Sequence, residues 1–487
     1  MMRANGTSAA PYGRSLFLLA VLVYGIAAWN STGYHSADEH HQIIEFAQHY
    51  LGDLTERQLA WEYPTGIRSS LQVWIAAGAI SGSRALGWSD PFTAMFLLRA
   101  LTAILALLAV RSFIRATAHE LPEGFRAGYT ALSYFLWYLP FLYVRFSSEA
   151  WSGILFLLAL AAMLRPERSA RWPFFSGVLL AAAVVCRPAV VPMVAGVIGW
   201  LIMVRREKLH TLVKVLLGGA LMAVLAWALD TVFYGELTFG PWHYYHMVIT
   251  GPPREAFDTL PWYYYAPWVV KYAIPPLGMA LLLALATLCF RRPAHVLAWV
   301  IVPTLIALSV LPHKELRFLF LLAPLSPLLL TIGLLEWRTF TGSIPPWTWK
   351  TVGMLVLAMN LLGLAVVSTQ PAGNGKTALV DHIGPEDRIT YLIDPTVVWR
   401  IALPPYYRPN ALGDTIMDPA IMNDAVSTEL LVAVPEQEQR LVERSGQRFI
   451  PLASTEPAWV TALLKAYTWN EAAPAWTLYR VVPAETR

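Results

Sequence analysis

The chain reads Pro312-His313-Lys314-Glu315-Leu316-Arg317-Phe318 between two long apolar runs, residues 294–311 and residues 318–337. Ionised side chains cost roughly 2.5 to 3.5 kcal/mol each at the centre of a bilayer, so near membrane depth they persist where they pair, meet water or hold a charged ligand. Three cationic or titratable groups beside one carboxylate favour an anionic ligand, most simply a phosphate.

A simpler explanation of this loop is also open. Short loops between transmembrane helices carry Lys and Arg as topology signals, because cationic loops stay on the cytoplasmic side of a membrane. The loop alone does not separate a topology signal from an anion site, and the rest of the chain bears on the choice.

The composition is that of a polytopic membrane protein. Of the 487 residues, 56% are apolar and only 14% are charged, and the apolar residues gather in runs too long for a soluble domain. The net charge of +4 is spread over loops, so we expect no nucleic-acid partner. Both cysteines, Cys186 and Cys289, fall inside apolar runs, and we expect no disulfide.

A transmembrane helix needs roughly 17 to 25 mostly apolar residues. Segments of this kind, some of them short, occur at residues 15–30, 92–112, 127–144, 150–165, 173–186, 189–204, 211–231, 266–290, 294–311, 318–337 and 349–368. The sequence therefore predicts an all-α polytopic domain over residues 1–369, with about 11 to 12 transmembrane helices. Residues 69–87 are apolar but diluted by Ser, Gly and Arg, and we expect them to form a juxtamembrane or re-entrant segment.

The cationic groups alternate along the chain with the other loops. By the positive-inside rule the cytoplasmic loops are those that carry Arg3/Arg14, Arg111/Arg115/Arg126, Arg165/Arg168/Arg171, Arg205/Arg206/Lys208/Lys214, Arg291/Arg292 and Arg338/Lys350. The outward set then comprises residues 31–91, 145–149, 187–188, 232–265, 312–317 and everything after 369. Every unusual polar cluster of the chain falls in this outward set.

The first outward loop carries an acidic pair, Asp38-Glu39, ahead of a segment with apolar positions at helical spacing. We expect that segment to be an amphipathic helix along the membrane surface. Ser36 and Glu39 also fit a capping box, in which the acidic pair would only stabilise a helix N-terminus. The vicinal His40 and His41 point apart on a helix, so we expect no metal site there.

Two further outward loops contain candidate ligand-binding residues. Arg187 precedes Pro188 inside a long apolar run, where proline breaks the helix, and a hairpin turn and an anion ligand are both open for this arginine. A later loop is crowded with aromatic residues and ends in Trp262-Tyr263-Tyr264. Such side chains serve interfacial belts as well as sugar-binding platforms, and composition does not separate the two.

Beyond Gln370 the long apolar runs stop. Residues 388–402, 428–434 and 476–482 have the pattern of strands, and residues 435–445 that of a helix, with Pro and Gly between them. We expect residues 370–487 to form a small extracytoplasmic α/β domain.

The order of the motifs is more specific than any one of them. The motifs are Asp38-Glu39, Trp61-Glu62 with Arg68-Ser69, Arg145 to Glu149, Arg187-Pro188, Asp230 to Gly235 with Trp262-Tyr263-Tyr264, and His313-Lys314-Glu315-Leu316-Arg317-Phe318. Over residues 15–340 this order resembles the polytopic mannosyltransferases of glycosyltransferase family 22, which have the GT-C fold and use dolichyl- or polyprenyl-phosphate mannose. Members build the glycosylphosphatidylinositol anchor and N-glycan precursors. The resemblance implies a GT-C fold and mannosyl transfer from a lipid phosphate.

Transfer from a lipid-phosphate sugar needs a base for the acceptor hydroxyl and cations for the departing phosphate. With this resemblance we expect Asp38 to be the base and Glu39 to orient or assist it. The residues expected to contact the donor phosphate are His313, Lys314, Arg317, Arg187 and Arg68. The residues expected to bind the rest of the substrate are Glu315, Trp262, Tyr263 and Tyr264.

The resemblance also implies the partners. We expect a polyprenyl-phosphate sugar donor, a lipid-linked or glycan acceptor and membrane lipids, and a direct displacement with inversion at the anomeric carbon. We expect no cofactor to be required; a divalent metal held by the acidic pair is the alternative. The expected location is the bacterial inner membrane with the active site on its outer face, or the endoplasmic reticulum membrane if the source is eukaryotic.

Two rival functions remain at this point. Charged groups and broken helices at membrane depth also occur in transporters and lipid flippases. Against these stand the absence of an inverted repeat in the sequence and the placement of the polar clusters on one face. A GT-C enzyme that moves another sugar, such as arabinose, is the other alternative.

Overall fold

In a computed structural model of the chain, the residues described are 11–167, 169–251, 259–338, 345–372, 376–384, 386–392, 403–404, 406–408, 414–418, 430–435, 438–439, 441, 448–466 and 475–482. The chain divides into two compact units. The first contains Met1–Ala27, His41–Gly78 and Leu98–Ser368, and the second contains Ala28–His40, Ala79–Leu97 and Thr369–Arg487.

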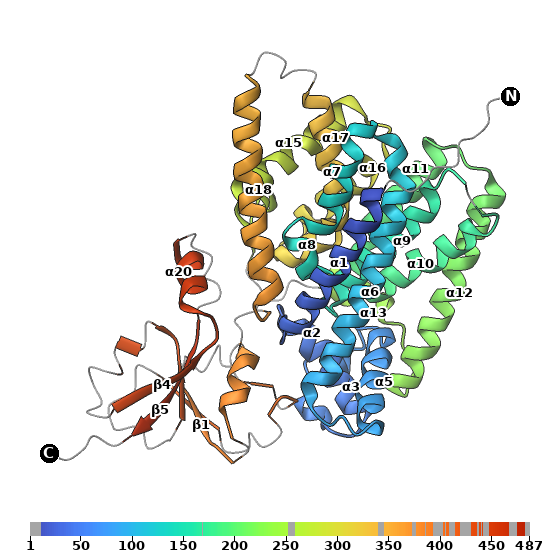
Figure 1. The fold of residues 1–487 in the computed structure, drawn as a ribbon. Helices are drawn as coiled ribbons and strands as arrows, with labels where there is room; N and C mark the ends of the chain where they lie inside the picture. The colour runs from blue at the N-terminus through green and yellow to red at the C-terminus, as the bar shows by residue number, and fades with distance from the viewer. Residues whose placement is uncertain are drawn as a thin grey trace. The chain divides into compact units, whose positions relative to one another are not determined.

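Helices make up most of the described chain (Figure 1). The longest are α1 (Pro11–Asn30), α6 (Pro91–Thr117), α12 (Leu209–Tyr234) and α18 (Pro346–Thr369). The shorter ones include α5 (Leu71–Ala85), α7 (Glu123–Phe135), α8 (Tyr138–Leu142), α9 (Ser148–Leu164), α10 (Trp172–Cys186), α11 (Val191–Met203), α14 (Tyr265–Tyr272), α15 (Pro275–Arg291), α16 (Val296–Val310) and α17 (Ser326–Trp337). Every transmembrane segment predicted from the sequence falls on at least one of these helices.

Within the described residues, four helices are each long and apolar enough to cross a bilayer: Gly13–Asn30, Pro91–Glu120, Leu209–Tyr234 and Lys350–Thr369. Helices α15 and α16 meet the same test together, as a pair bent by 119°. Shorter apolar helices cover Ser148–Leu164, Trp172–Cys186, Pro188–Met203 and Ala323–Trp337. The chain is therefore a helical integral membrane protein, as predicted, while the number of crossings stays a prediction.

The apolar run at residues 127–144 is two helices rather than one, because Leu136 adopts an extended backbone between α7 and α8. The polar backbone groups freed by this break are met by a side chain from α18. Asn360 donates to the carbonyl of Phe135 at 2.8 Å and accepts from the N–H of Trp137 at 2.9 Å. A broken helix is tolerated among apolar neighbours when such a partner satisfies its backbone.

Helices α10 and α12 lie side by side (Figure 1) and approach closely at two glycines. A Cβ atom on Gly177 would lie 1.9 Å from the carbonyl oxygen of Val215, and one on Gly218 would lie 2.0 Å from that of Phe174. Only glycine permits such contact between the two backbones.

The acidic pair lies in α2 (Ala37–Glu39), and the amphipathic helix expected after it is divided into a π-helical turn (His40–Ile44) and α3 (Glu45–Tyr50). Phe46 in α3 is fully buried, and its ring lies 5.2 Å from the ring of Tyr63 and 6.4 Å from that of Phe233. Protein rather than bilayer therefore covers much of the apolar side of this segment.

Residues 69–87, expected not to cross the membrane, contain α5. A helix of this length is about 22 Å long, less than the roughly 30 Å of a bilayer core. The juxtamembrane or re-entrant placement stays a prediction.

The second unit holds a five-stranded sheet of order β2-β1-β3-β5-β4. Its strands are β1 (Ile389–Leu392), β2 (Thr415–Met417), β3 (Leu430–Ala433), β4 (Arg448–Ser454) and β5 (Thr477–Val482). β1 pairs in parallel with β2 and β3, whereas β5 runs antiparallel to β3 and β4. Both faces of the central strands are buried, one around Tyr391 and Val432 and the other around Leu431 and Tyr479.

The predicted strand regions at 388–402, 428–434 and 476–482 contain β1, β3 and β5, so the small α/β domain is confirmed in class. Residues 393–402 and most of the helix predicted at 435–445 lie outside the described residues. β2, β4 and α20 (Ala458–Ala466) were not predicted from the sequence. The two missed strands are the edges of the sheet, where exposed residues weaken the hydrophobic pattern.

Candidate active site

A buried carboxylate, Glu149, pairs with two arginines of the first unit. Nη2 of Arg187 lies 3.2 Å from Oε1 of Glu149, and Nη1 of Arg317 lies 3.5 Å from the same oxygen. The side chains of Glu149 and Arg187 are each only 3% exposed. Two guanidinium groups thus share one carboxylate oxygen away from bulk water.

Helix ends explain how Glu149 and Arg187 are placed. Glu149 lies in the first turn of α9, whose N-cap Ser147 accepts a hydrogen bond from the N–H of Ala150 at 3.2 Å. Arg187 follows α10, and Pro188 prevents that helix from continuing. An anion at a helix N-terminus and a cation at a C-terminus are both favourable for the helix dipole.

Arg187 retains donors for a ligand. Its Nε and Nη1 atoms are buried and form no hydrogen bond with any described residue. Its guanidinium lies 5.5 Å from the ring centroid of Phe318, a contact that orients the guanidinium plane but does not satisfy its N–H groups. Buried donors without an acceptor cost free energy, so the oxygens of an anion would fit here.

Glu315 holds the loop at 312–317 together. It accepts hydrogen bonds from Nε and Nη2 of Arg317 at 2.5 and 2.7 Å, and it contacts Nε2 of His313 at 2.9 Å. Burial alone would raise the pKa of Glu315, but the hydrogen bonds from His313 and Arg317 and their charges lower that pKa well below its usual range. Glu315 is therefore ionised, and it orients the guanidinium of Arg317 in a planar bidentate pair.

Lys314 ties this loop to the aromatic loop. Its Nζ donates to the carbonyls of Leu260 at 3.0 Å and Leu311 at 2.5 Å, while the N–H of Leu260 donates to the carbonyl of Pro312. Burial lowers the pKa of this amine. These two bonds use two of the three N–H groups of a lysine, so one remains for a ligand.

The aromatic side chains predicted to bind substrate follow directly from this junction. Trp262 is 73% exposed and Tyr263 is 54% exposed, and their ring centroids are 5.8 Å apart. Tyr264 instead packs its ring against Trp268 at 4.8 Å. The exposed pair is available for a sugar or for the membrane interface, and Tyr264 has a packing role as well.

Arg68 belongs to a second polar group of the first unit. Its Nη2 lies 3.7 Å from Oε1 of the buried Glu62, which also accepts from Gln42 at 2.8 Å. The carbonyl of Arg68 accepts from the hydroxyl of Tyr234 at 2.7 Å. This arginine pairs with a carboxylate other than Glu149 or Glu315, and its role at the phosphate stays a prediction.

Asp38 and Glu39 belong to the second unit, in the first turn of α2. Ser36 is the N-cap residue of α2, but its side chain makes no capping hydrogen bond, so the capping box expected from the sequence does not form. Glu39 is buried with 9% exposure. The acidic pair is thus not explained by a capping box.

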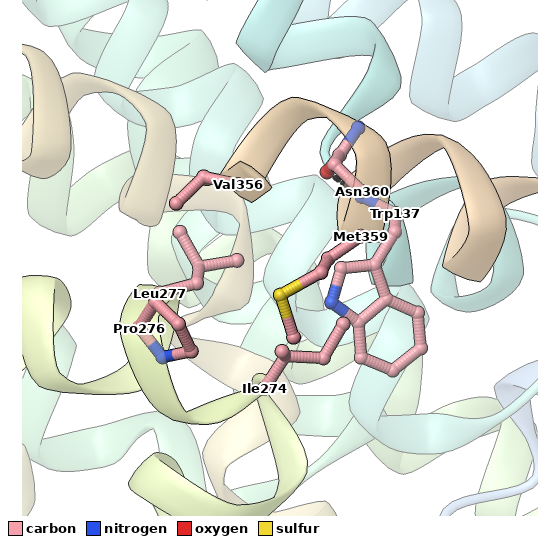
Figure 2. A pocket seen from close by; sticks show the side chains of 7 residues that line it. All are labelled: Trp137, Ile274, Pro276, Leu277, Val356, Met359 and Asn360. Carbon is pink, nitrogen blue, oxygen red and sulfur yellow. Dashed lines mark hydrogen bonds between the residues drawn. The ribbon is translucent and has the colours of Figure 1, made fainter. Parts of the chain in front are cut away.

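Neither a metal cluster nor the pocket of Figure 2 adds to this site. Across the ranges described, no group of three or more His, Cys, Asp or Glu side chains is arranged to hold a metal ion. A small pocket carries no ionisable side chain and is lined by Trp137, Ile274, Pro276, Leu277, Val356, Met359 and Asn360 (Figure 2).

The predictions from the sequence assigned no role in the site to two carboxylates, Glu149 and Asp230. Glu149 joins the two arginines, and the fully buried Asp230 accepts from the backbone of Ser70 at 2.7 Å and of Gly240 at 3.1 Å. Each stands at the end of an apolar run, where a carboxylate is costly unless it is paired. That position was the signal that could have identified both of them.

Comparison with known proteins identifies the family of this chain. The model of the Alg9-like mannosyltransferase family matches residues 15–375. A protein of Eremothecium gossypii, named GPI mannosyltransferase 3, is 32% identical in an alignment of 187 residues that covers 34% of this chain and 30% of that protein. The protein of the same name from Drosophila melanogaster is 26% identical in an alignment of 393 residues that covers 73% of this chain and 62% of that protein. The chain thus spans less than two thirds of the length of these relatives.

A solved structure shares the fold. The crystal structure of ArnT from Cupriavidus metallidurans bound to undecaprenyl phosphate superposes with a TM-score of 0.54 at 13% identity, over 96% of this chain and 98% of that one. At this identity the likeness concerns the fold alone, which is the GT-C fold predicted from the motifs.

Proposed function

This chain belongs to the Alg9-like mannosyltransferase family, and we propose that it transfers a mannosyl residue from a polyprenyl-phosphate donor to a hydroxyl of a lipid-linked or glycan acceptor. The names of the relatives support the sugar, since they are GPI mannosyltransferases. The undecaprenyl phosphate bound by ArnT supports a polyprenyl phosphate as the donor lipid for this fold.

The observation that carries the proposal is the pair of arginines around the buried Glu149. Arg187 and Arg317 share the carboxylate of Glu149, and two buried guanidinium nitrogens of Arg187, Nε and Nη1, have no acceptor in the described chain. Guanidinium groups bind phosphate through paired hydrogen bonds, and these bonds strengthen in a site that excludes water. We assign the donor phosphate to these arginines, with His313 and Lys314 beside them and Arg68 as a further candidate.

The proposed reaction is a single displacement. The carboxylate of Asp38 accepts the proton of the acceptor hydroxyl while the hydroxyl oxygen forms a bond to the anomeric carbon. The bond from that carbon to the phosphate oxygen breaks, and its electron pair leaves on the polyprenyl phosphate. The arginines stabilise the charge that develops there. Attack opposite the departing phosphate inverts the anomeric configuration, and Glu39 orients or assists the base.

Substrate selection is assigned to the aromatic loop. Trp262 and Tyr263 present exposed rings next to the phosphate loop, since the backbones of Leu260 and Pro312 are hydrogen-bonded. Aromatic faces pack against the C–H faces of sugars, and Glu315 supplies a carboxylate in the same loop. The integral membrane location follows from the helices, and we propose the outward face as the side of reaction.

The test is a transfer assay with purified protein. Radiolabelled polyprenyl-phosphate mannose is incubated with protein and a lipid extract, and the labelled product is isolated and its anomeric linkage determined. We expect label in a lipid-linked or glycan product with inverted configuration. Transfer of arabinose but not mannose from matched donors would replace the sugar, and movement of intact donor across vesicles without transfer would make the protein a flippase.

A further inference from the structure

A column of stacked rings lies next to the acidic turn of the second unit. The ring of His40 stacks on Tyr34 at 5.3 Å with 27° between the planes, and on Tyr407 at 5.6 Å with 30°. His40 is 1% exposed and Tyr407 is 4% exposed. Tyr407 also meets Phe92 at 5.1 Å, and Nζ of Lys376 lies 5.0 Å from the ring centroid of Tyr34.

The column joins parts of the chain that are distant in sequence. Tyr34 and His40 flank the acidic pair, Phe92 lies in the first turn of α6, and Lys376 and Tyr407 come from the C-terminal part. Backbone contacts support the same connection, since the N–H of Ala372 donates to the carbonyl of Thr32 at 2.8 Å. The hydroxyl of Tyr406 donates to the carbonyl of Pro91 at 3.3 Å.

The acidic turn needs outside support. The helix α2 has only three residues, and the N–H of His40 closes it on the carbonyl of Ala37. The helical segment continues without a break through the π-helical turn (His40–Ile44) into α3, so the acidic pair lies in its first turn, and the N-cap Ser36 gives that turn no side-chain hydrogen bond. The first turn of a helix has backbone N–H groups without intrahelical partners and frays readily, so packing from outside helps to hold its geometry. His40 directly follows Glu39, and the rings packed on His40 therefore restrain the direction in which the two carboxylates leave the turn.

The support is itself rigid. Arg408, next to Tyr407, donates to the carboxylate of Asp414 at 2.6 Å and to the carbonyl of Asp387. The carboxylate of Asp414 in turn accepts from the N–H of Ile389, the first residue of β1, at 3.0 Å. Arg408 and Asp414 thus link the backbone next to Tyr407 to the first residue of β1.

From these contacts we propose that Tyr407 is a positioning residue that acts through His40 to orient the Asp38-Glu39 pair for proton transfer. The C-terminal domain then contributes to turnover and not only to the surroundings of the reaction. This inference rests on the proposed role of Asp38 as the base. Because Tyr407 is proposed to act through His40 on the acidic pair, its removal should affect the rate of the chemical step more than the binding of donor.

The experiment compares Tyr407→Leu, Tyr407→Phe and Phe449→Leu in the full-length enzyme. Phe449 is the matched control, because it is a half-buried ring of the same sheet packed edge-on against Tyr479 at 6.2 Å, outside the column. For each variant the kcat, the KM for the polyprenyl-phosphate sugar and the melting temperature are measured. If Tyr407→Leu does not fold, His40→Leu is measured in its place, since it removes the other half of the stack.

We expect Tyr407→Leu to lower kcat roughly 10- to 100-fold with KM for the donor within about twofold. Tyr407→Phe keeps the ring, so its kcat should stay close to that of the unsubstituted enzyme. Phe449→Leu should lower the melting temperature without lowering kcat. An unchanged kcat in Tyr407→Leu, or an equal loss in Phe449→Leu, overturns the positioning role. Asp38→Asn is assayed alongside: if it is active the proposed base is wrong, whereas an inactive Asp38→Asn beside an active Tyr407→Leu overturns only this inference.

Discussion

At the scale of single residues, the geometry of guanidinium groups governs the candidate site. Arg317 makes a bidentate pair with Glu315 and also approaches Glu149, while its guanidinium lies 5.7 Å from the ring of Phe318. A lysine would keep the charge but would offer a compact ammonium in place of a planar set of donors. The two kinds of cation are therefore distinguishable by experiment.

We predict that Arg317→Lys lowers kcat/KM on the order of 100-fold, because the planar donors at the departing phosphate are lost while the charge is kept. Initial rates over a range of donor concentrations measure this effect. The control is Arg338→Lys, at an exposed arginine that follows α17 and lies 5.9 Å from the ring of Phe125. It should change the rate by less than about twofold. Equal activity of the two variants would indicate that the loop at 312–317 is only a topology signal.

Asp38→Asn separates a structural from a catalytic role of the acidic pair. If Asp38 only interacts with the helix dipole, the change costs about 0.3 to 1 kcal/mol of local stability and leaves turnover intact. If it is the general base, turnover falls about 100- to 10,000-fold. We expect the second result, with donor binding retained. Initial rates, donor binding and thermal stability are measured together.

Glu39→Gln is the companion variant. Because Glu39 is expected to orient or assist, its loss of activity should be smaller than that of Asp38→Asn. A stable and active Asp38→Asn enzyme would pass the role of base to Glu39 or to an acid outside this turn.

At the scale of helices, contact between backbones limits which residues can stand at the positions where two helices cross. Helices α10 and α12 touch at Gly177 and Gly218, and a Cβ on Gly218 would lie 2.0 Å from a backbone carbonyl oxygen. A backbone cannot turn aside as a flexible side chain does. The two helices would therefore have to separate to accept any other residue.

We predict that Gly218→Ala destabilises the protein by about 1 to 3 kcal/mol, the usual cost of overpacking. Thermal unfolding in detergent measures the change. Gly353→Ala in α18 is the control, since a Cβ there meets nothing within 4 Å. The control should unfold at the same or a slightly higher temperature, because alanine favours a helix by about 1 kcal/mol over glycine. Equal melting temperatures for the two variants would contradict the close crossing.

At the scale of the whole molecule, the reaction depends on which loops share one side of the membrane. The alternation of cationic and polar loops predicts a cytoplasmic N-terminus and an outward location for residues after 369. Single cysteines at Ser169 and Asp381, both exposed, test this in a background without Cys186 and Cys289. We expect an impermeant thiol reagent to label the Asp381 position from outside intact cells and the Ser169 position only after the membrane is opened. Labelling of both from one side would remove the shared outward face.

The sequence by itself identified a helical membrane protein and its family, and it singled out the loop at 312–317, whose role at the donor phosphate stays a prediction. It could do so because the hydropathy of a span is a local property and because the motif order is read directly along the chain. The C-terminal strands with buried faces, β1, β3 and β5, were recognised for the same reason. The exposed edge strands, β2 and β4, lacked that pattern and were missed.

Only the tertiary structure showed that Glu149 pairs with both Arg187 and Arg317, that Asn360 of α18 satisfies the break between α7 and α8, and that His40 lies between Tyr34 and Tyr407. The members of each group come from distant parts of the chain. Their meeting depends on the packing of whole elements, on close crossings such as that of α10 and α12, and on the helix ends that prolines and caps create. No local period of the sequence encodes such contacts. They form because a buried polar group without a partner, or a buried ring without neighbours, would cost free energy.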